Sequence, residues 1–205
     1  MDLLHYGAVL MAHFHGGVVE RENITVEDTS APVYYVYDES WSTAGQGVAF
    51  SHIIINRAQV EDRPDFIHDF IFLHEAGHKQ WSWPLQWFFT VGQFSYLSLM
   101  IASLIALPSL VFRAISIDSG SNVINLLTVP VSLGIILIIP LLITWFDEGY
   151  AEIHAISQIG LSTYLEIQNI RQSKSYPLFS RIRSVVMYPP TSLILAIFRY
   201  RSDES

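Results

Sequence analysis

Two histidines and a glutamate in the stretch FLHEAGHK have the types and spacing of a metal-dependent hydrolytic site. His74 and His78 stand four residues apart, so on an α-helix both imidazoles project from one face and can hold one metal ion. Glu75 lies between them and can act as general base toward a water molecule that the metal activates. The H-E-x-x-H pattern therefore predicts a zinc site, with His74 and His78 as ligands and Glu75 as the catalytic carboxylate.

A third ligand is expected in the stretch DEGYAEIHA, because a catalytic zinc ion holds three protein ligands and keeps one position open. Glu148 and Glu152 stand one helical turn apart, and Ala151 and Ala155 on the same side allow another helix to approach closely. We predict that Glu148 is the ligand and that Glu152 accepts the free N–H of a liganding histidine, with an exchange of the two roles as the alternative. Asp147 is interpreted as a solvent-facing charge near the start of a helix.

The two histidines must be positioned by a helix, which we predict over 61–81. Ile67 and Ile71 continue the face of the histidines at helical spacing. Asp62 is the expected N-cap of this helix.

A small β-sheet is expected before the helix. Residues 31–38 and 47–56 are rich in valine, isoleucine and tyrosine and are predicted strands, whereas 17–28 is either another strand or irregular. The segment HIIIN (52–56) is either an edge strand that binds substrate by β-augmentation or an ordinary core strand. The N-terminal segment 1–17 is interpreted as an amphipathic helix or an interfacial segment.

The composition favours a membrane protein. Only 15% of the residues are charged, against about 25% in an average soluble domain. Two charge-free runs exceed the roughly 20 residues that cross a bilayer core, and we predict spans over about Trp87–Phe112 and Val123–Trp145, with two buried core helices as the alternative. Of the 11 Lys and Arg, only Arg113 lies in the link between the spans, which predicts that both flanks face the cytoplasm.

The charge balance and the absence of cysteine exclude other classes of site. The formal net charge is -8 and no basic patch with interleaved aromatic residues is present, so a nucleic acid is not an expected partner. Without cysteine the chain has neither disulfides nor thiolate metal ligands. After the second predicted span, helices are expected over 147–172, 178–187 and 191–201.

Together these motifs resemble the HtpX-like membrane zinc endopeptidases, which are relatives of the CAAX prenyl endopeptidases. In that family H-E-x-x-H precedes two membrane helices and then E-x-x-A-D, whose Glu is the third zinc ligand. Here Glu148-Gly-Tyr-Ala-Glu152 stands in that place, with Glu152 instead of Asp. The resemblance covers roughly 31–200, and the family's N-terminal pair of membrane helices is missing.

The resemblance also points to a strand before the zinc helix. The family carries N-A-F-A there and is expected to pair this strand with the substrate backbone. In this chain the Asn is replaced by valine, and the matching residues are Val48, Ala49 and Phe50.

A zinc peptidase also needs a donor for the charge that develops on the carbonyl oxygen in the transition state. The sequence does not single one out. The candidates are His154, Arg183, Tyr188 and Arg199.

The expected fold is an α+β, mainly helical membrane zincin in a single domain over 1–205. Its parts are an N-terminal region with the small sheet and zinc helix (1–86), two transmembrane helices inserted between the zinc-ligand helices (87–145), and a helical region with the third ligand (146–205).

The expected function is a membrane-bound zinc endopeptidase with one Zn²⁺ per chain and polypeptide substrates, namely membrane or unfolded proteins met at the cytoplasmic surface of the lipid bilayer. The alternative is a non-catalytic, zinc-stabilised membrane scaffold or a pseudoprotease, which leaves Glu75 without a role. An intramembrane protease of the site-two kind would need an Asp ligand within a span, and neither span contains one.

Overall fold

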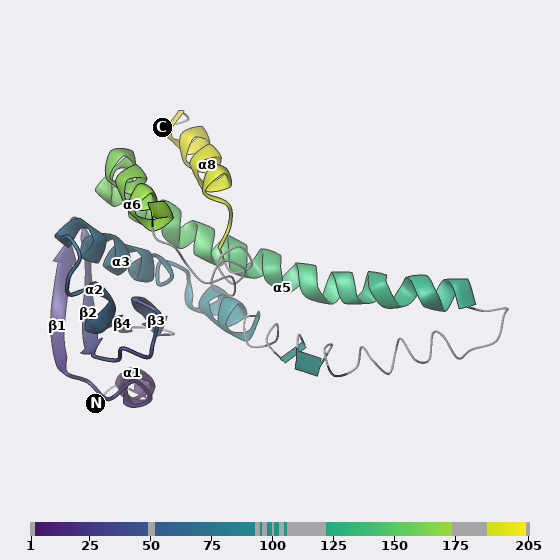
Figure 1. The fold of residues 1–205 in the computed structure, drawn as a ribbon, viewed down its shortest axis with the longest axis horizontal. Coiled ribbons are helices and arrows are strands. Elements are labelled where there is room, and N and C mark those ends of the chain that lie inside the picture. The colour runs from purple at the N-terminus through teal and green to yellow at the C-terminus, as the bar shows by residue number, and fades with distance from the viewer. Residues whose placement is uncertain are drawn as a thin grey trace.

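The computed structural model describes residues 3–48, 52–92, 95, 98–99, 101–102, 105, 122–173 and 188–203. The fold is α+β, with a small sheet at one end and helices on both of its faces (Figure 1). A helical segment over 83–92 precedes the long helix of the molecule. The other elements are α1 (Leu3–His13), β1 (Glu20–Val26), β2 (Thr29–Val36), β3 (Gly45–Val48), β4 (His52–Asn56), α2 (Arg57–Val60), α3 (Asp65–Gly77), α5 (Asn122–Ile159), α6 (Leu161–Ser173) and α8 (Thr191–Asp203).

The four strands form one mixed sheet in the order β1-β2-β4-β3. β1 and β2 are an antiparallel pair, β2 and β4 run parallel, and β3 lies antiparallel to β4 at an edge. The predicted strand 47–56 is thus two strands folded on each other, with Val48 opposite His52. The interpretation of 52–56 as an edge strand is wrong, because β4 is central and all five of its residues are buried.

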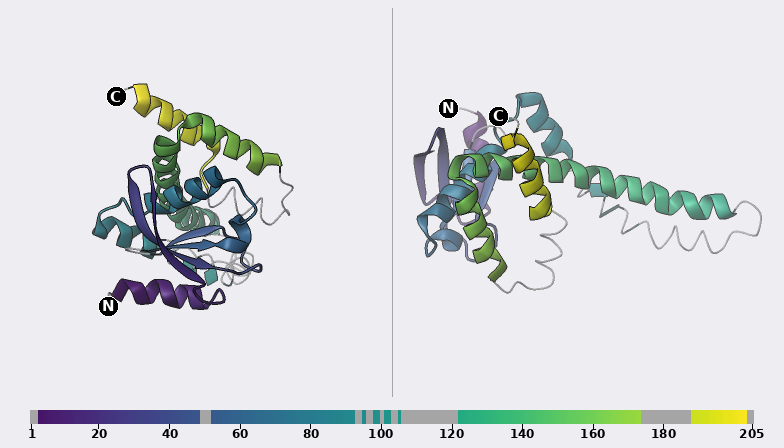
Figure 2. Two further views of the ribbon diagram at one scale, coloured as in Figure 1. Left: turned by 90° about the vertical axis from the view of Figure 1, so that its left-hand side faces the viewer. Right: turned by 90° about the horizontal axis from the view of Figure 1, so that it is seen from above.

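Both faces of the central strands are covered. Ile53 and Ile55 pack into a core with the apolar side chains of α3, whereas Ile54 packs with Ala8 and Ala12 of α1. Alternate residues of a strand point to opposite faces, so a strand buried on both sides is apolar throughout. Figure 2 shows α1 and α3 on opposite sides of the sheet.

The end of α1 is held to the loop after β2 by a histidine. The Nδ1 atom of His15 lies 3.0 Å from Oδ2 of Asp38, and the His15 ring stacks on Trp41 with 3.9 Å between centroids. Asn56 at the end of β4 donates hydrogen bonds to the carbonyl oxygens of Asp38 and Trp41. These contacts fix the layer of α1 against the sheet.

α3 begins later than predicted. Its N-terminal flanking residue is Pro64, with φ −56° and ψ 148°, and not Asp62. The extended ψ of Pro64 takes the preceding residues out of the helix, and Arg57–Val60 form the separate helix α2. Asp65 in the first turn of α3 places a negative charge at the positive end of the helix dipole.

The helix α3 packs against α5 through small residues. A Cβ atom on Gly77 would lie 2.7 Å from the Cα atom of Ala151, which is closer than two carbon atoms can pack. Ala151 and Ala155 are both fully buried. The backbones of α3 and α5 therefore approach closely at the end of α3, where the two histidines lie.

A glycine separates α5 from α6. Gly160 has φ +84°, a conformation that glycine adopts at little cost, and the predicted helix 147–172 is divided there. The last predicted helix, 191–201, corresponds to α8. The predicted helix 178–187 lies outside the described residues.

The prediction of two membrane spans is wrong. In the part of the chain that the structure describes, no helix has both the length and the apolar character needed to cross a bilayer. The predicted span Val123–Trp145 is not an element of its own, because α5 runs on to Ile159 and carries Asp147 and Glu148. The predicted span Trp87–Phe112 falls partly on residues outside the described ranges. A run without charged residues shows only the composition of a segment and does not define a membrane helix. The predictions of transmembrane helices and of an integral-membrane localisation are therefore wrong.

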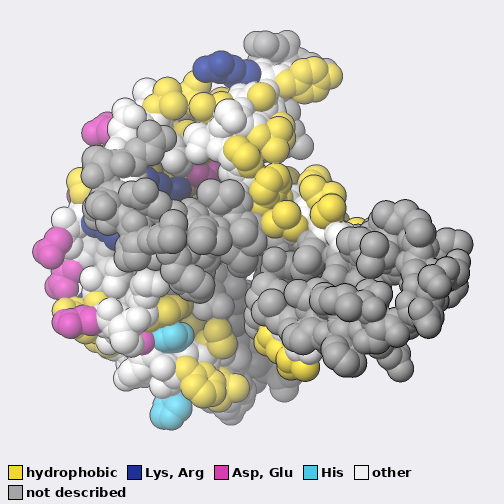
Figure 3. Space-filling model, turned by 45° about the vertical axis from the view of Figure 1, so that its right-hand side comes forward, with side chains coloured by type: hydrophobic (Ala, Val, Ile, Leu, Met, Phe, Trp, Pro, Cys, Tyr) yellow, Lys and Arg dark blue, Asp and Glu magenta, His cyan; other side chains and the backbone are white. Residues whose placement is uncertain are grey.

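The N-terminal part of α5 extends away from the sheet (Figure 1). Hydrophobic side chains are exposed along α5 and α8 (Figure 3). They include Ile138, Ile139, Leu142 and Phe146 of α5 and Leu193, Ile197 and Tyr200 of α8. The buried cores thus account for only part of the hydrophobic composition of the chain.

Candidate metal centre

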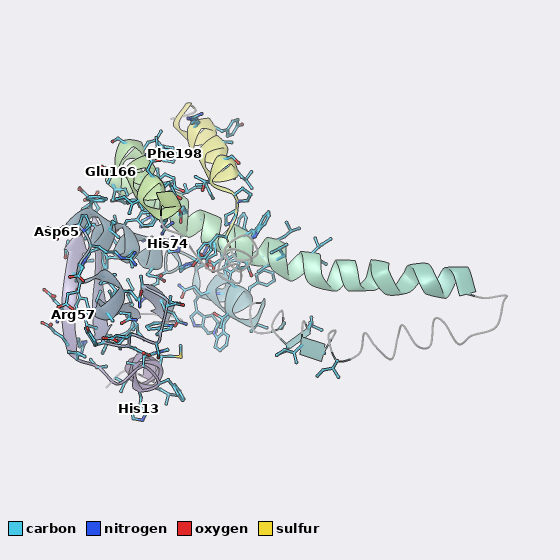
Figure 4. The ribbon with its side chains drawn as sticks, in the orientation of Figure 1. His13, Arg57, Asp65, His74, Glu166 and Phe198 are labelled. Carbon is cyan, nitrogen blue, oxygen red and sulfur yellow. The ribbon has the colours of Figure 1, made fainter. Side chains whose placement is uncertain are left out.

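Three possible metal ligands converge where α3 passes α5, close to His74 in Figure 4. Oε2 of Glu148 lies 3.3 Å from Nε2 of His74 and 3.9 Å from Nε2 of His78. The ligand atoms of the three residues all lie within 4.8 Å of one another. His74, His78 and Glu148 therefore form a possible metal-binding triad.

The buried polar atoms of this triad fit a cation. Oε2 of Glu148 is buried and accepts no hydrogen bond from the described residues. A buried carboxylate oxygen without a donor is costly, and a metal ion facing it and two imidazole nitrogens would remove that cost. Two imidazoles and one carboxylate are a ligand set that leaves a further position open on a four-coordinate metal.

A second carboxylate lies behind His74. Oε2 of Glu152 is 3.3 Å from Nδ1 of His74, and its Oε1 accepts a hydrogen bond from Gln168 at 3.2 Å. Nη1 of Arg171 lies 3.5 Å from the same Oε1. Burial alone would raise the pKa of Glu152, but His74 and Arg171 outweigh it and hold the pKa at about 2. Glu152 is therefore favoured in its ionised form, beside the His74 ring that it can orient.

Asp147 plays the same part for His78, a role that the sequence interpretation missed. It is buried, and its Oδ2 lies 3.1 Å from Nδ1 of His78. Its Oδ1 accepts a hydrogen bond from the indole N–H of Trp81 at 3.1 Å. The signal was its position one turn before Ala151, on the helix face that meets α3. Asp147 is not solvent-facing, because its side chain is buried against His78 and Trp81. It is not near a helix start either, because α5 begins at Asn122.

The electrostatics of the two imidazoles follow from these carboxylates. Burial disfavours the charged form of His74, but Glu148 and Glu152 outweigh it and raise its pKa well above the usual range. The pKa of His78 is likewise raised, because Asp147 and Glu148 outweigh the effect of burial. The carboxylates around the two imidazoles therefore attract positive charge, whether protons or a metal ion.

Glu75 is held by the edge strand β3. Its Oε2 accepts a hydrogen bond from the backbone N–H of Gly47 at 2.5 Å. A Cβ atom on Gly45 would lie 3.0 Å from Cγ of Glu75, and one on Gly47 would lie 3.3 Å from its Oε2. Glycine at these positions lets the strand pass directly against the carboxylate and fix its direction. The sequence interpretation missed both glycines.

The candidate donors for the transition state lie in different places. Tyr188 is about half exposed, and the negative charges of Glu148 and, to a smaller extent, Glu75 raise the pKa of its phenol. His154 on α5 has a pKa lowered by burial and by His74, and its Nε2 is buried without a hydrogen-bond partner among the described residues.

The remaining predicted site residues are less informative. Arg199 lies on an exposed face of α8, and Arg183 lies outside the described residues. Val48 is the last residue of β3, whereas Ala49 and Phe50 fall outside the described residues.

Comparisons with known proteins add nothing to this geometry. No family model matches the chain, and neither a curated protein nor a solved structure matches it.

Proposed function

We propose that this chain is a zinc-dependent endopeptidase that hydrolyses peptide bonds in unfolded or extended polypeptides. The observation that carries the proposal is the convergence of two imidazoles and one carboxylate from two helices, with a second, separately held carboxylate at Glu75. A purely structural metal site has no use for a carboxylate in that place, whereas hydrolysis requires a base. The resemblance to the HtpX-like endopeptidases supports the same reaction.

In this proposal His74, His78 and Glu148 hold the zinc ion. When bound, zinc supplies Lewis acidity, which lowers the pKa of water and polarises a peptide carbonyl. Glu75 accepts a proton from the attacking water, whose oxygen bonds to the carbonyl carbon. The C–N bond then breaks, and Glu75 delivers the proton to the leaving amine nitrogen. Gly47 keeps the Glu75 carboxylate in one direction throughout.

The same proposal assigns the edge strand β3 to the substrate. Among the described strands β3 pairs with β4 alone, and its Gly47 lies against Glu75. An extended polypeptide can add to such an edge through backbone hydrogen bonds. The N–H of Gly47 is taken by Glu75, so the substrate would pair with other backbone groups of β3.

The test is the substitution Glu75→Gln. A glutamine oxygen can still accept the Gly47 hydrogen bond, but the amide cannot take a proton from water. We expect one bound zinc per chain, measured by atomic absorption, and no cleavage of a reduced, carboxymethylated protein substrate. Glu166→Gln, which removes an exposed carboxylate of α6 (Figure 4), is the matched control.

Two outcomes contradict the proposal. One is cleavage by the Glu75→Gln protein at the wild-type rate. The other is a wild-type protein that binds zinc at this site and cleaves no unfolded substrate, which would favour a non-catalytic zinc-stabilised protein instead.

A further inference from the structure

A small cavity lies between α3, α6 and the start of β3. Its volume is about 60 Å³. Five apolar residues and two arginines line it: Ala44, Ile67, Ile71, Ile167, Ile170, Arg63 and Arg171. The isoleucines of α3 and Ile167 are buried, whereas Arg171 is exposed, so the cavity has an apolar floor and a charged rim.

The cavity is next to the proposed catalytic carboxylate. Ile71 precedes Glu75 by four residues on α3, which is about 6 Å along the helix axis. Ala44 is followed by Gly45, where a Cβ atom would lie 2.7 Å from Cγ2 of Ile71 and 3.0 Å from Cγ of Glu75. Gly45 thus separates the cavity wall from the base. A residue next to a peptide bond held at Glu75 could place its side chain in this cavity.

The two arginines at the rim are not equivalent. Arg171 is engaged, because its guanidinium lies 3.5 Å from Glu152 and 4.9 Å from the centroid of the Phe70 ring. The Arg63 side chain forms no ion pair with any residue in the described ranges. Arg63 is therefore the positive charge left to meet a ligand at this cavity.

The size of the cavity limits what can enter. A cavity needs about 10–15 Å³ to hold one water molecule, so this cavity has room for about four to six non-hydrogen atoms. A short aliphatic side chain fits these limits, and an aromatic ring does not. Apolar walls suit methylene groups, and a guanidinium at the rim suits a terminal carboxylate.

We propose that this cavity is a specificity pocket that receives a glutamate side chain from the residue beside the cleaved bond. The two methylene groups lie against the isoleucines, and the carboxylate pairs with Arg63. This inference rests on the proposed function for the position of the cleaved bond. The residues that determine the preference are Arg63, Ile67 and Ile71.

The binding test uses the zinc-loaded Glu75→Gln protein with isotope-labelled isoleucine methyl groups. Two capped tetrapeptides serve as probes, identical except for one glutamate or one glutamine. We expect the methyl signals of Ile67, Ile71, Ile167 and Ile170 to shift with the glutamate peptide. Because charge-assisted hydrogen bonds are about twice as strong as neutral ones, we expect about fivefold to tenfold tighter binding than for the glutamine peptide.

The variant Arg63→Gln should bind the two peptides equally. Arg57→Gln is the matched control, because it removes an equal charge at α2, where Arg57 pairs with Glu20, and should keep the preference. Unmoved isoleucine signals, or the same loss of preference in both variants, would overturn the pocket.

A cleavage arm with wild-type protein separates the two proposals. We expect kcat/KM to be higher for the glutamate peptide, with cleavage at a bond flanking that residue. Cleavage of both peptides at equal rates would overturn the pocket and leave the endopeptidase intact. Selective binding without any cleavage would overturn the endopeptidase and leave a glutamate-binding pocket.

Discussion

Each histidine of the triad lies between two carboxylates. His74 has Glu148 at its Nε2 and Glu152 at its Nδ1, and His78 has Glu148 at its Nε2 and Asp147 at its Nδ1. A carboxylate beside Nδ1 favours the tautomer with the proton on that nitrogen, which leaves the lone pair of Nε2 for a metal ion. The shared carboxylate, Glu148, is then the one that completes the ligand set.

The substitution Asp147→Asn tests this arrangement at the second histidine. Asparagine keeps the size of the side chain but removes the charge that fixes the His78 ring. We expect zinc affinity to fall by about 10–100-fold, as is usual when such a partner is lost. The measurement is competition with a zinc-binding dye, with Glu166→Gln as control. Unchanged affinity would show that Asp147 does not orient the ligand.

Among the described candidates for stabilising developing charge, Tyr188 is the one that both Glu148 and Glu75 affect electrostatically. Its phenol stays protonated, because the nearby charges of Glu148 and Glu75 raise its pKa. We expect Tyr188→Phe to lower kcat by about 100-fold or more, the usual effect of losing one such donor, with KM and bound zinc little changed. Tyr37→Phe, at an exposed tyrosine, is the control. A wild-type kcat for Tyr188→Phe would exclude this role.

At the scale of single residues, the sequence predicts which side chains share one face of a helix. The spacing of His74 and His78 fixes their common helix face, and the structure brings Glu148 to them. The sequence interpretation placed a helix start near 147 and therefore took Asp147 for a solvent-facing charge. Its contact with His78 was missed for this reason, because α5 begins far upstream. Gly47 acts through its backbone N–H and through its lack of a side chain, so no pattern of side-chain types marks it.

At the scale of elements, the approach of α3 to α5 determines whether the ligands meet. Gly77→Ala would place a methyl group 2.7 Å from the Cα atom of Ala151 and force the helices apart. Such overpacking costs about 1–3 kcal/mol, and we expect both the free energy of unfolding in urea and the zinc affinity to fall.

The matched control for that substitution is Gly134→Ala. Gly134 lies in α5, and a Cβ atom there meets nothing within 4 Å among the described residues. Alanine is a better helix former than glycine by about 1 kcal/mol, so this variant should be at least as stable as the wild type. Equal effects of the two substitutions would contradict close packing at Gly77.

The prediction of a single strand over 47–56 and the prediction of two membrane spans were wrong for reasons of context. A largely apolar segment such as 47–56 does not show where a chain reverses, and β3 and β4 divide it. The two long apolar runs do not show at which residue a helix begins or ends. The helix α5 joins a predicted span to the carboxylates of the site, so the two belong to one element.

At the scale of the molecule, the triad connects two helices that are far apart in the sequence. An ion that binds the folded chain and not the unfolded chain stabilises it, by about 2.7 kcal/mol at a hundredfold excess over Kd. For a chain of 205 residues this corresponds to a rise in Tm of about 5–10 °C. Thermal unfolding with zinc and with a chelator measures the shift. Glu148→Gln should greatly reduce it, and a full shift in that variant would exclude Glu148 as a ligand.

The corner at Gly160 imposes a length constraint on the chain. Glu152 and Gln168 are 16 residues apart and form a hydrogen bond, with Gly160 midway between them. A helix turns by about 100° per residue, so one residue inserted between Gly160 and Gln168 would rotate Gln168 and Arg171 away from Glu152. Insertions in α6 are therefore tolerated only after Arg171, and the first turns of this helix are of fixed length although they contain none of the triad.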